Sequence, residues 1–118
     1  MEDTIFGKIT RGEIPTEFLY EDEQCVVIRD IHPQAPTHVL IIPRKPIPRL
    51  VDSSADDQAL LGHLLLVAGR VAEDLGVGDA FRLVINNGEG GGQTVFHLHL
   101  HIRAGREMTE GQLTAGLN

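Results

Sequence analysis

The chain has 118 residues, of which 42% are hydrophobic and 23% charged, and its formal net charge is −7 at pH 7. These values are typical of one globular domain, and no apolar run approaches the ~20 residues that cross a bilayer. The negative charge argues against broad nucleic-acid binding, although local donors could still hold a small phosphorylated ligand. The lone Cys25 and the acidic N-terminus, which has no signal pattern, favour a reducing compartment. We therefore expect one cytoplasmic domain over residues 1–118, without a membrane or nucleic-acid partner.

The first half of the chain predicts a short helix and three strands. Thr4–Arg11 carries apolar residues at helical spacing, with Asp3 as the N-cap and Gly12 as the stop. Strands are expected where apolar runs lie between turn residues, at 18–20, 25–29 and 38–42. The intervening segment 30–37 contains two prolines and is predicted to be a loop.

The second half predicts one long helix and two strands. Apolar residues recur every three or four positions from Leu60 to Leu75, with Ser53 or Ser54 as the cap and Gly76 as the end. Strands are expected at 81–85 and 95–102, and an irregular tail at 106–118, which leaves a core of about residues 4–105. The order predicts an α+β domain in which a five-stranded antiparallel sheet has its helices on one face.

A row of three histidines is the most distinctive feature of the sequence. In an extended strand, His97, His99 and His101 would share one face, and the alternating apolar residues would face the core: Phe96, Leu98, Leu100 and Ile102. The glycine-rich segment 86–94 leads into this row. Exposed backbone amides beside titratable rings are suited to binding an anion.

Two chemical interpretations of the histidine row are open. Neutral imidazole is a common zinc ligand, but Glu89 is the one carboxylate near the row, and acids that orient metal-bound rings are expected. Alternatively, one ring is a nucleophile that attacks phosphorus while its neighbours stabilise the phosphoryl oxygens. The glycine-rich segment is not a Walker A loop, because no Gly-Lys-Ser/Thr follows it.

The segment His97-Leu98-His99-Leu100-His101 resembles the HxHxHxx signature of the histidine-triad (HIT) superfamily. Further blocks are similar to the Hint branch of that superfamily: 5–9, 12–15, 30–31, 33–38, 40–43, Asn86 and 92–95. The resemblance covers about residues 4–105. It implies a HIT-like fold and a homodimeric, nucleotide-binding phosphoramidase that acts on purine nucleoside 5′-monophosphoramidates without a metal or cofactor.

The resemblance also implies catalytic roles. His99 would be the nucleophile that forms a covalent nucleotidyl-histidine, and the backbone carbonyl of His97 would orient it. His101 would donate to the phosphate oxygens, and His38 would support the cluster from the third strand. Thr94 stands where the family usually has serine, near the leaving group.

Other residues are implied to bind the nucleotide. Asp30 would accept hydrogen bonds from the ribose, Ile31 and Phe6 would flank the base, and Asn86 and the Gly92 amide would contact the phosphate. Gln93 is assigned to the same binding set. On sequence alone, Asp30 could equally be a turn acid and Asn86 a strand-end cap. His32 and His63 are interpreted as structural or solvated.

Arg103 departs from the family pattern, which usually has an apolar residue there. Strand alternation would place Arg103 on the face of the triad, where it would touch the leaving group or an anionic extension of the substrate. The alternative is a solvent-facing strand end. Two further functions compete with the phosphoramidase: dinucleoside polyphosphate hydrolysis, as in the Fhit branch, and a non-catalytic module that binds purine nucleotides or proteins.

Overall fold

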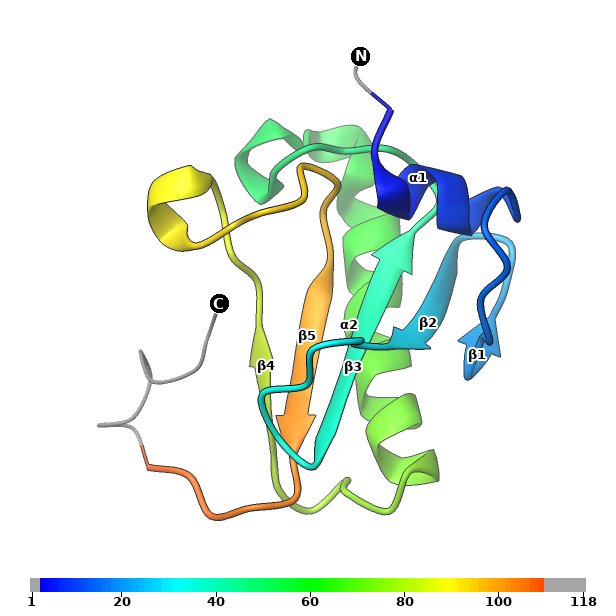
Figure 1. Cartoon of the computed structure of the whole chain (residues 1–118). Coiled ribbons are helices and arrows are strands. Elements are labelled where there is room, and N and C mark those ends of the chain that lie inside the picture. Colours follow the sequence, from blue (N-terminus) through cyan, green and yellow to red (C-terminus); the bar gives the residue numbers. More distant parts are fainter. Residues whose placement is uncertain (1–2, 110–118) are drawn as a thin grey trace.

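A computed structural model describes residues 3–109 and shows a five-stranded antiparallel sheet with two helices (Figure 1). The strands lie in the order β1-β2-β3-β5-β4, so β5 is flanked on both sides. The elements are α1 Ile5–Thr10, β1 Tyr20–Glu21, β2 Cys25–Arg29, β3 Thr37–Pro43, α2 Gln58–Asp74, β4 Phe81–Val84 and β5 Leu100–Ala104. The predicted α+β fold class is confirmed.

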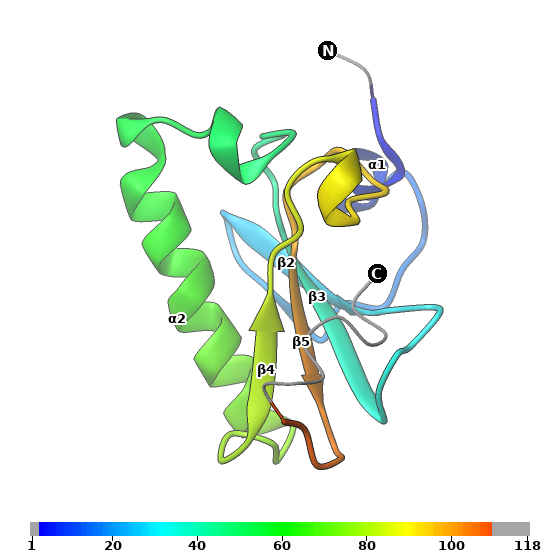
Figure 2. The same ribbon diagram turned by 90° about the vertical axis from the view of Figure 1, so that its left-hand side faces the viewer.

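The helices lie on opposite faces of the sheet, as the edge-on view in Figure 2 shows, so the prediction that they share one face is wrong. In β2, Cys25 and Val27 face α2, whereas Val26 and Ile28 face α1. All four residues are buried. A continuous apolar run, rather than alternation, is typical of a strand covered on both faces.

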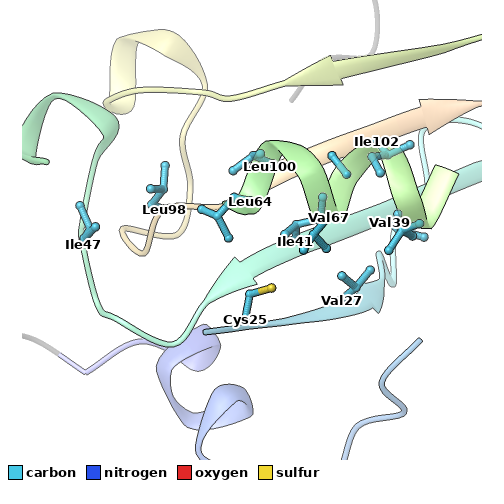
Figure 3. Packing of buried hydrophobic residues seen from close by; sticks show 12 residues of the cluster. Cys25, Val27, Val39, Ile41, Ile47, Leu64, Val67, Leu98, Leu100 and Ile102 are labelled. Atoms are coloured by element: carbon cyan, nitrogen blue, oxygen red, sulfur yellow. The ribbon is translucent and has the colours of Figure 1, made fainter. Parts of the chain in front are cut away.

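The larger core lies between α2 and the sheet (Figure 3). Leu64, Val67 and Val71 of α2 pack against Ile41 and Ile102 of the two central strands. Single-turn 3₁₀ helices at Leu50–Asp52 and Ala55–Asp57 precede α2, and Ser54 caps the second of them rather than α2 itself. Within residues 3–109, no helix is long and apolar enough to cross a membrane.

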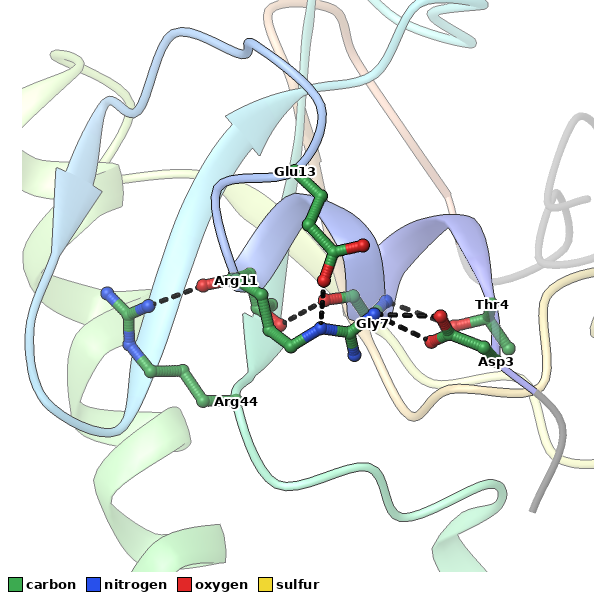
Figure 4. A network of polar contacts seen from close by, with 7 residues as sticks. Asp3, Thr4, Gly7, Arg11, Glu13 and Arg44 are labelled. Carbon is green, nitrogen blue, oxygen red and sulfur yellow. Dashed lines mark hydrogen bonds and ion pairs between the residues drawn. The ribbon is translucent and has the colours of Figure 1, made fainter.

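Polar contacts stabilise the ends of α1, and one of them ties it to Arg44, just after β3 (Figure 4). The Thr4 hydroxyl, rather than Asp3, caps the helix by accepting from the N–H of Gly7 at 3.1 Å. Arg11 pairs with Asp3 at 2.8 Å, and Arg44 donates to the carbonyl of Thr10 at 2.6 Å. These contacts matter because α1 carries Phe6 to the histidine cluster.

The strand predicted at 95–102 begins only at Leu100. Residues 95–99 pair with no neighbouring strand, although the N–H of Leu98 donates to the carbonyl of Ile47 at 2.7 Å. Without a regular pleat the alternation fails, and Phe96 is 41% exposed instead of facing the core. Residues 106–109 of the predicted tail carry no helix or strand, and 110–118 lie outside the described residues.

Gly105 ends β5 with a φ of +97°, a conformation that disfavours any side chain. A Cβ at this position would also lie 2.8 Å from Pro36 Cβ, in the loop before β3. We expect Gly105→Ala to lower the free energy of unfolding by at least about 1–2 kcal/mol, as measured by urea denaturation. Gly62→Ala is the matched control: it lies on α2 with open space around it and should stabilise by up to about 1 kcal/mol. Equal effects of the two substitutions would contradict this explanation.

Candidate active site

A cavity of about 310 Å³ lies between α1, the loop after β2 and the glycine-rich segment. Its lining includes eight of the predicted site residues: Phe6, Asp30, Ile31, Asn86, Gly92, Thr94, His99 and His101. Three predicted residues do not line it: His38, Gln93 and His97. A larger hollow of about 620 Å³ near Gly76 and Met108 has no histidine in its lining. The cavity at His99 and His101 is therefore the candidate site.

The backbone sets the tautomer of His99. Its Nδ1 lies 2.7 Å from the carbonyl oxygen of His97, which can only accept, so Nδ1 carries the proton. In the neutral ring Nε2 then holds the free lone pair. The Phe6 ring packs edge-on against His99, with centroids 4.8 Å apart and an interplanar angle of 82°. This arrangement provides an oriented, unprotonated nitrogen beside the cavity.

A chain of hydrogen bonds through His38 sets the tautomer of His101. The N–H of Gln34 donates to His38 Nδ1 at 2.9 Å, so a neutral His38 carries its proton on Nε2. His38 Nε2 lies 2.9 Å from His101 Nδ1 and donates to it, which leaves the His101 proton on Nε2. No hydrogen-bond partner for this buried nitrogen lies within the described part of the chain. His101 thus offers an N–H donor to a ligand.

Burial keeps these imidazoles neutral. It lowers the pKa of His38, His97 and His99 below the ordinary value, and it lowers the pKa of His101 to about 3 with help from the neighbouring rings. A neutral His99 retains the lone pair that attack requires. A neutral His101 still donates through Nε2.

The ring of His97 has a structural partner of its own. Its Nε2 lies 2.6 Å from the carbonyl oxygen of Pro43, at the end of β3, and therefore donates to it. The ring lies away from the cavity that His99 and His101 line. The three imidazoles therefore do not form one row facing a ligand, and the backbone carbonyl of His97 is its contact with His99.

Asp30 acts as a turn acid and also lines the cavity. Its Oδ1 accepts from the N–H of His32 at 2.8 Å, as a turn acid does, while Oδ2 lies 3.4 Å from His38 Nε2. The carboxylate also lines the cavity. Thr94 lies there too, and its side chain is exposed. Both residues can therefore contact a ligand.

The glycine-rich segment is held by Gln93. Its Oε1 accepts from the N–H of Gly88 at 2.8 Å, and its Nε2 donates to the carbonyls of Pro48 and Val95. The predicted contact of Gln93 with the nucleotide does not match this position, because its amide is engaged by backbone. Gly92 adopts a φ of +92° and lines the cavity, but its N–H donates to the Glu89 carbonyl rather than into the cavity.

We expect Gln93→Leu to destabilise the protein by about 1–3 kcal/mol, because it leaves three buried or half-buried backbone groups without partners. Thermal and urea denaturation would measure the change. Asn87→Ala provides a comparison in the same loop. It removes one hydrogen bond, to the exposed N–H of Val51, and should cost about 0.5–1 kcal/mol. A smaller loss for Gln93→Leu than for Asn87→Ala would refute the supporting role.

Arg103 lies on the predicted face of the sheet, because it is opposite His38, which contacts His101, but it is buried there. It is 1% exposed, so it is not a solvent-facing strand end, and it does not line the cavity. The reason is topological: β5 lies between β3 and β4, where Arg103 is opposite His38 and Arg82. Burial lowers the pKa of the Arg103 guanidinium, and the negative charge of Asp30 offsets this in part.

The zinc interpretation of the triad is not supported by the geometry. Among residues 3–109, two groups place potential ligand atoms within 4.8 Å of one another. One contains Asp30, His38 and His101, and the other contains Asp22, Cys25 and His63. Neither group includes His97 or His99.

Several residues that line the site were missed from the sequence. Gln34 acts through its backbone N–H, for which residue identity gives no signal. His32, interpreted as structural or solvated, lines the cavity. His32 directly precedes the segment 33–38, which resembles the Hint branch, and this position was the available signal for it. The apolar floor, from Ile9, Ile28 and Leu40, depends on α1 covering this face of the sheet.

Comparison with known proteins agrees with this geometry. An uncharacterized HIT-like protein of Synechocystis is 64% identical over 105 residues, 89% of this chain and 92% of that protein. The crystal structure of a HIT family hydrolase from Legionella pneumophila has a TM-score of 0.88 at 46% identity and covers 92% of this chain and 97% of that chain. The crystal structure of a histidine triad nucleotide-binding protein from Candida albicans has a TM-score of 0.76 at 32% identity, and the match covers 85% of this chain and 73% of that chain. Residues 11–108 match the HIT domain, and the chain therefore belongs to the HIT family.

Proposed function

We propose that this protein is a nucleotide-binding hydrolase that cleaves the P–N bond of purine nucleoside 5′-monophosphoramidates. The observation that carries the proposal is the pair of oriented rings beside the cavity. His99 presents a lone pair on Nε2, and His101 presents an N–H donor on Nε2. Attack on phosphorus with stabilisation of its oxygens needs both. The relatives described as a hydrolase and as a nucleotide-binding protein support the same class.

The proposed reaction has two steps. In the first, His99 Nε2 bonds to phosphorus while the P–N bond breaks, and the amine leaves with its electron pair and takes up a proton. The Thr94 hydroxyl, at the cavity, can guide that proton. In the second, water bonds to phosphorus as the Nε2–P bond breaks, which releases the nucleoside 5′-monophosphate and a proton. His101 donates to the phosphoryl oxygens throughout, and the nucleoside lies between Asp30, Ile31 and Phe6.

The test offers the protein adenosine 5′-phosphoramidate and diadenosine polyphosphate in parallel, with a chelator present. We expect turnover of the phosphoramidate and accumulation of a nucleotidyl adduct on His99, detected by mass spectrometry after rapid quenching. Preferred cleavage of the polyphosphate would favour the Fhit-like alternative. Binding of nucleoside monophosphate without turnover of either compound would favour a non-catalytic module.

The proposal includes a homodimer in the cytoplasm. Leu65 and Leu66, on the outer side of α2, are 54% and 77% exposed and would be covered if α2 packed against a second copy. Sedimentation at several concentrations measures the assembly directly, and a monomer at all of them would remove this part of the proposal.

A further inference from the structure

A second cluster of reactive side chains lies outside the nucleotide cavity. Asp22 lies in the turn between β1 and β2, Cys25 begins β2, and His63 lies in the first half of α2. Their ligand atoms are all within 4.8 Å of one another, although His63 is 38 to 41 residues away in sequence. None of the three lines the cavity at His99. The function proposed above does not use them.

The cluster is half open to solvent. Cys25 is fully buried and belongs to the large core (Figure 3), whereas the side chains of His63 and Asp22 are 29% and 24% exposed. His63 Nε2 and Asp22 Oδ2 are 2.6 Å apart. Solvent therefore reaches the cluster from the side of His63 and Asp22, and a small ion entering there would contact the buried sulfur of Cys25.

The carboxylate is held in place by other groups. Asp22 Oδ1 accepts from the N–H groups of Gln24 and Cys25 at 2.7 and 2.8 Å, and the Tyr20 hydroxyl donates to Oδ2 at 2.9 Å. Such partners fix the ligand atoms of metal sites. The turn also carries Glu23, whose charge favours a cation, whereas Glu21 is paired with Arg44 at 3.4 Å.

We propose that Asp22, Cys25 and His63 bind a divalent thiophilic ion of the zinc class, with a water as the fourth ligand. One thiolate, one imidazole and one carboxylate are ligand types that zinc accepts, at bond lengths of about 2.0–2.3 Å. Tetrahedral bonds of this length place ligand atoms about 3.5 Å apart, so the short contact between His63 and Asp22 opens slightly.

The proton balance of binding is simple. In the metal-free protein His63 Nε2 donates to Asp22 Oδ2 at 2.6 Å, so Nε2 gives up this proton to solvent and Nδ1 takes one from solvent before Nε2 can ligate. The Cys25 thiol also releases one proton to solvent, so metal binding releases one proton in all. The thiolate and the carboxylate then neutralise the two positive charges of the ion. The ion would link the β1–β2 turn to α2, at a distance from the nucleotide cavity.

The experiment titrates the full chain, stripped of metal, with Co²⁺ as an optical stand-in for Zn²⁺, followed by Zn²⁺ competition. We expect one equivalent to bind with a thiolate-to-cobalt charge-transfer band. Cys25→Ser and His63→Asn should each abolish the band, and His63→Asn should weaken binding by at least about 100-fold. Tyr20→Phe should weaken it by roughly 10-fold, since it removes a partner of the carboxylate.

His38→Asn is the matched control, because it disrupts the other group of potential ligands, Asp30, His38 and His101. It should leave the cobalt band unchanged. His63 is half exposed, so its variant tests the proposal even if Cys25→Ser fails to fold; circular dichroism checks each fold. Absence of the band, its persistence in His63→Asn, or its loss in His38→Asn would each overturn the proposal.

Discussion

His99→Ala is expected to lower turnover of adenosine 5′-phosphoramidate by at least about a thousandfold, because it removes the nucleophile of the proposed mechanism. The nucleotidyl adduct should disappear with it. His97→Ala should cost far less activity, since the contact between the two residues is the His97 backbone carbonyl, which the substitution retains. Its expected effect is on stability, because the Pro43 carbonyl loses the hydrogen bond from the His97 ring.

Single-turnover kinetics and mass spectrometry of the quenched reaction measure both variants. Comparing the two variants separates what the His97 main chain contributes to activity from what the His97 side chain contributes. Equal loss of activity in His97→Ala and His99→Ala, with both proteins folded, would mean that the His97 ring takes part in the chemistry. Full activity of His99→Ala would remove the covalent mechanism.

Acid is expected to unfold the protein through its buried histidines. The unfolded chain binds protons to these rings near their ordinary pKa of about 6.5, whereas the pKa of His101 in the folded protein is about 3. Between these values the unfolded state binds more protons, so the free energy of unfolding falls as the pH decreases from 6.5 toward 3. The lowered pKa values of His38, His97 and His99 act in the same direction.

Urea denaturation at half-unit pH steps measures this slope. His101→Asn should flatten it, whatever it does to stability at neutral pH. Gly105→Ala should lower stability at every pH without changing the slope, because it introduces backbone strain and no titratable group. A slope that is the same in wild type and His101→Asn would show that His101 is not the group that acid protonates on unfolding.

Much of the fold could be predicted from local patterns. The strand at 25–29 has the predicted limits, and α2 occupies the predicted periodic segment with its end before Gly76. These elements depend on spacing, capping and turn residues, which act over a few positions. The side of the sheet that each helix covers was not predicted correctly, because it depends on contacts between α1 and strands more than fifteen residues away.

The sequence by itself determined the residue types of the site and brought His97, His99 and His101 together within five positions. Only the tertiary structure decided what each ring does. The ring of His97 donates a hydrogen bond to the Pro43 carbonyl, and the His97 carbonyl accepts one from His99 Nδ1. His38 Nε2 donates a hydrogen bond to His101 Nδ1. These roles depend on backbone groups and on strand neighbours such as β3, which lies some sixty residues before β5. A side chain's chemistry is local, but its burial and its hydrogen-bond partners are set by the packing of distant segments.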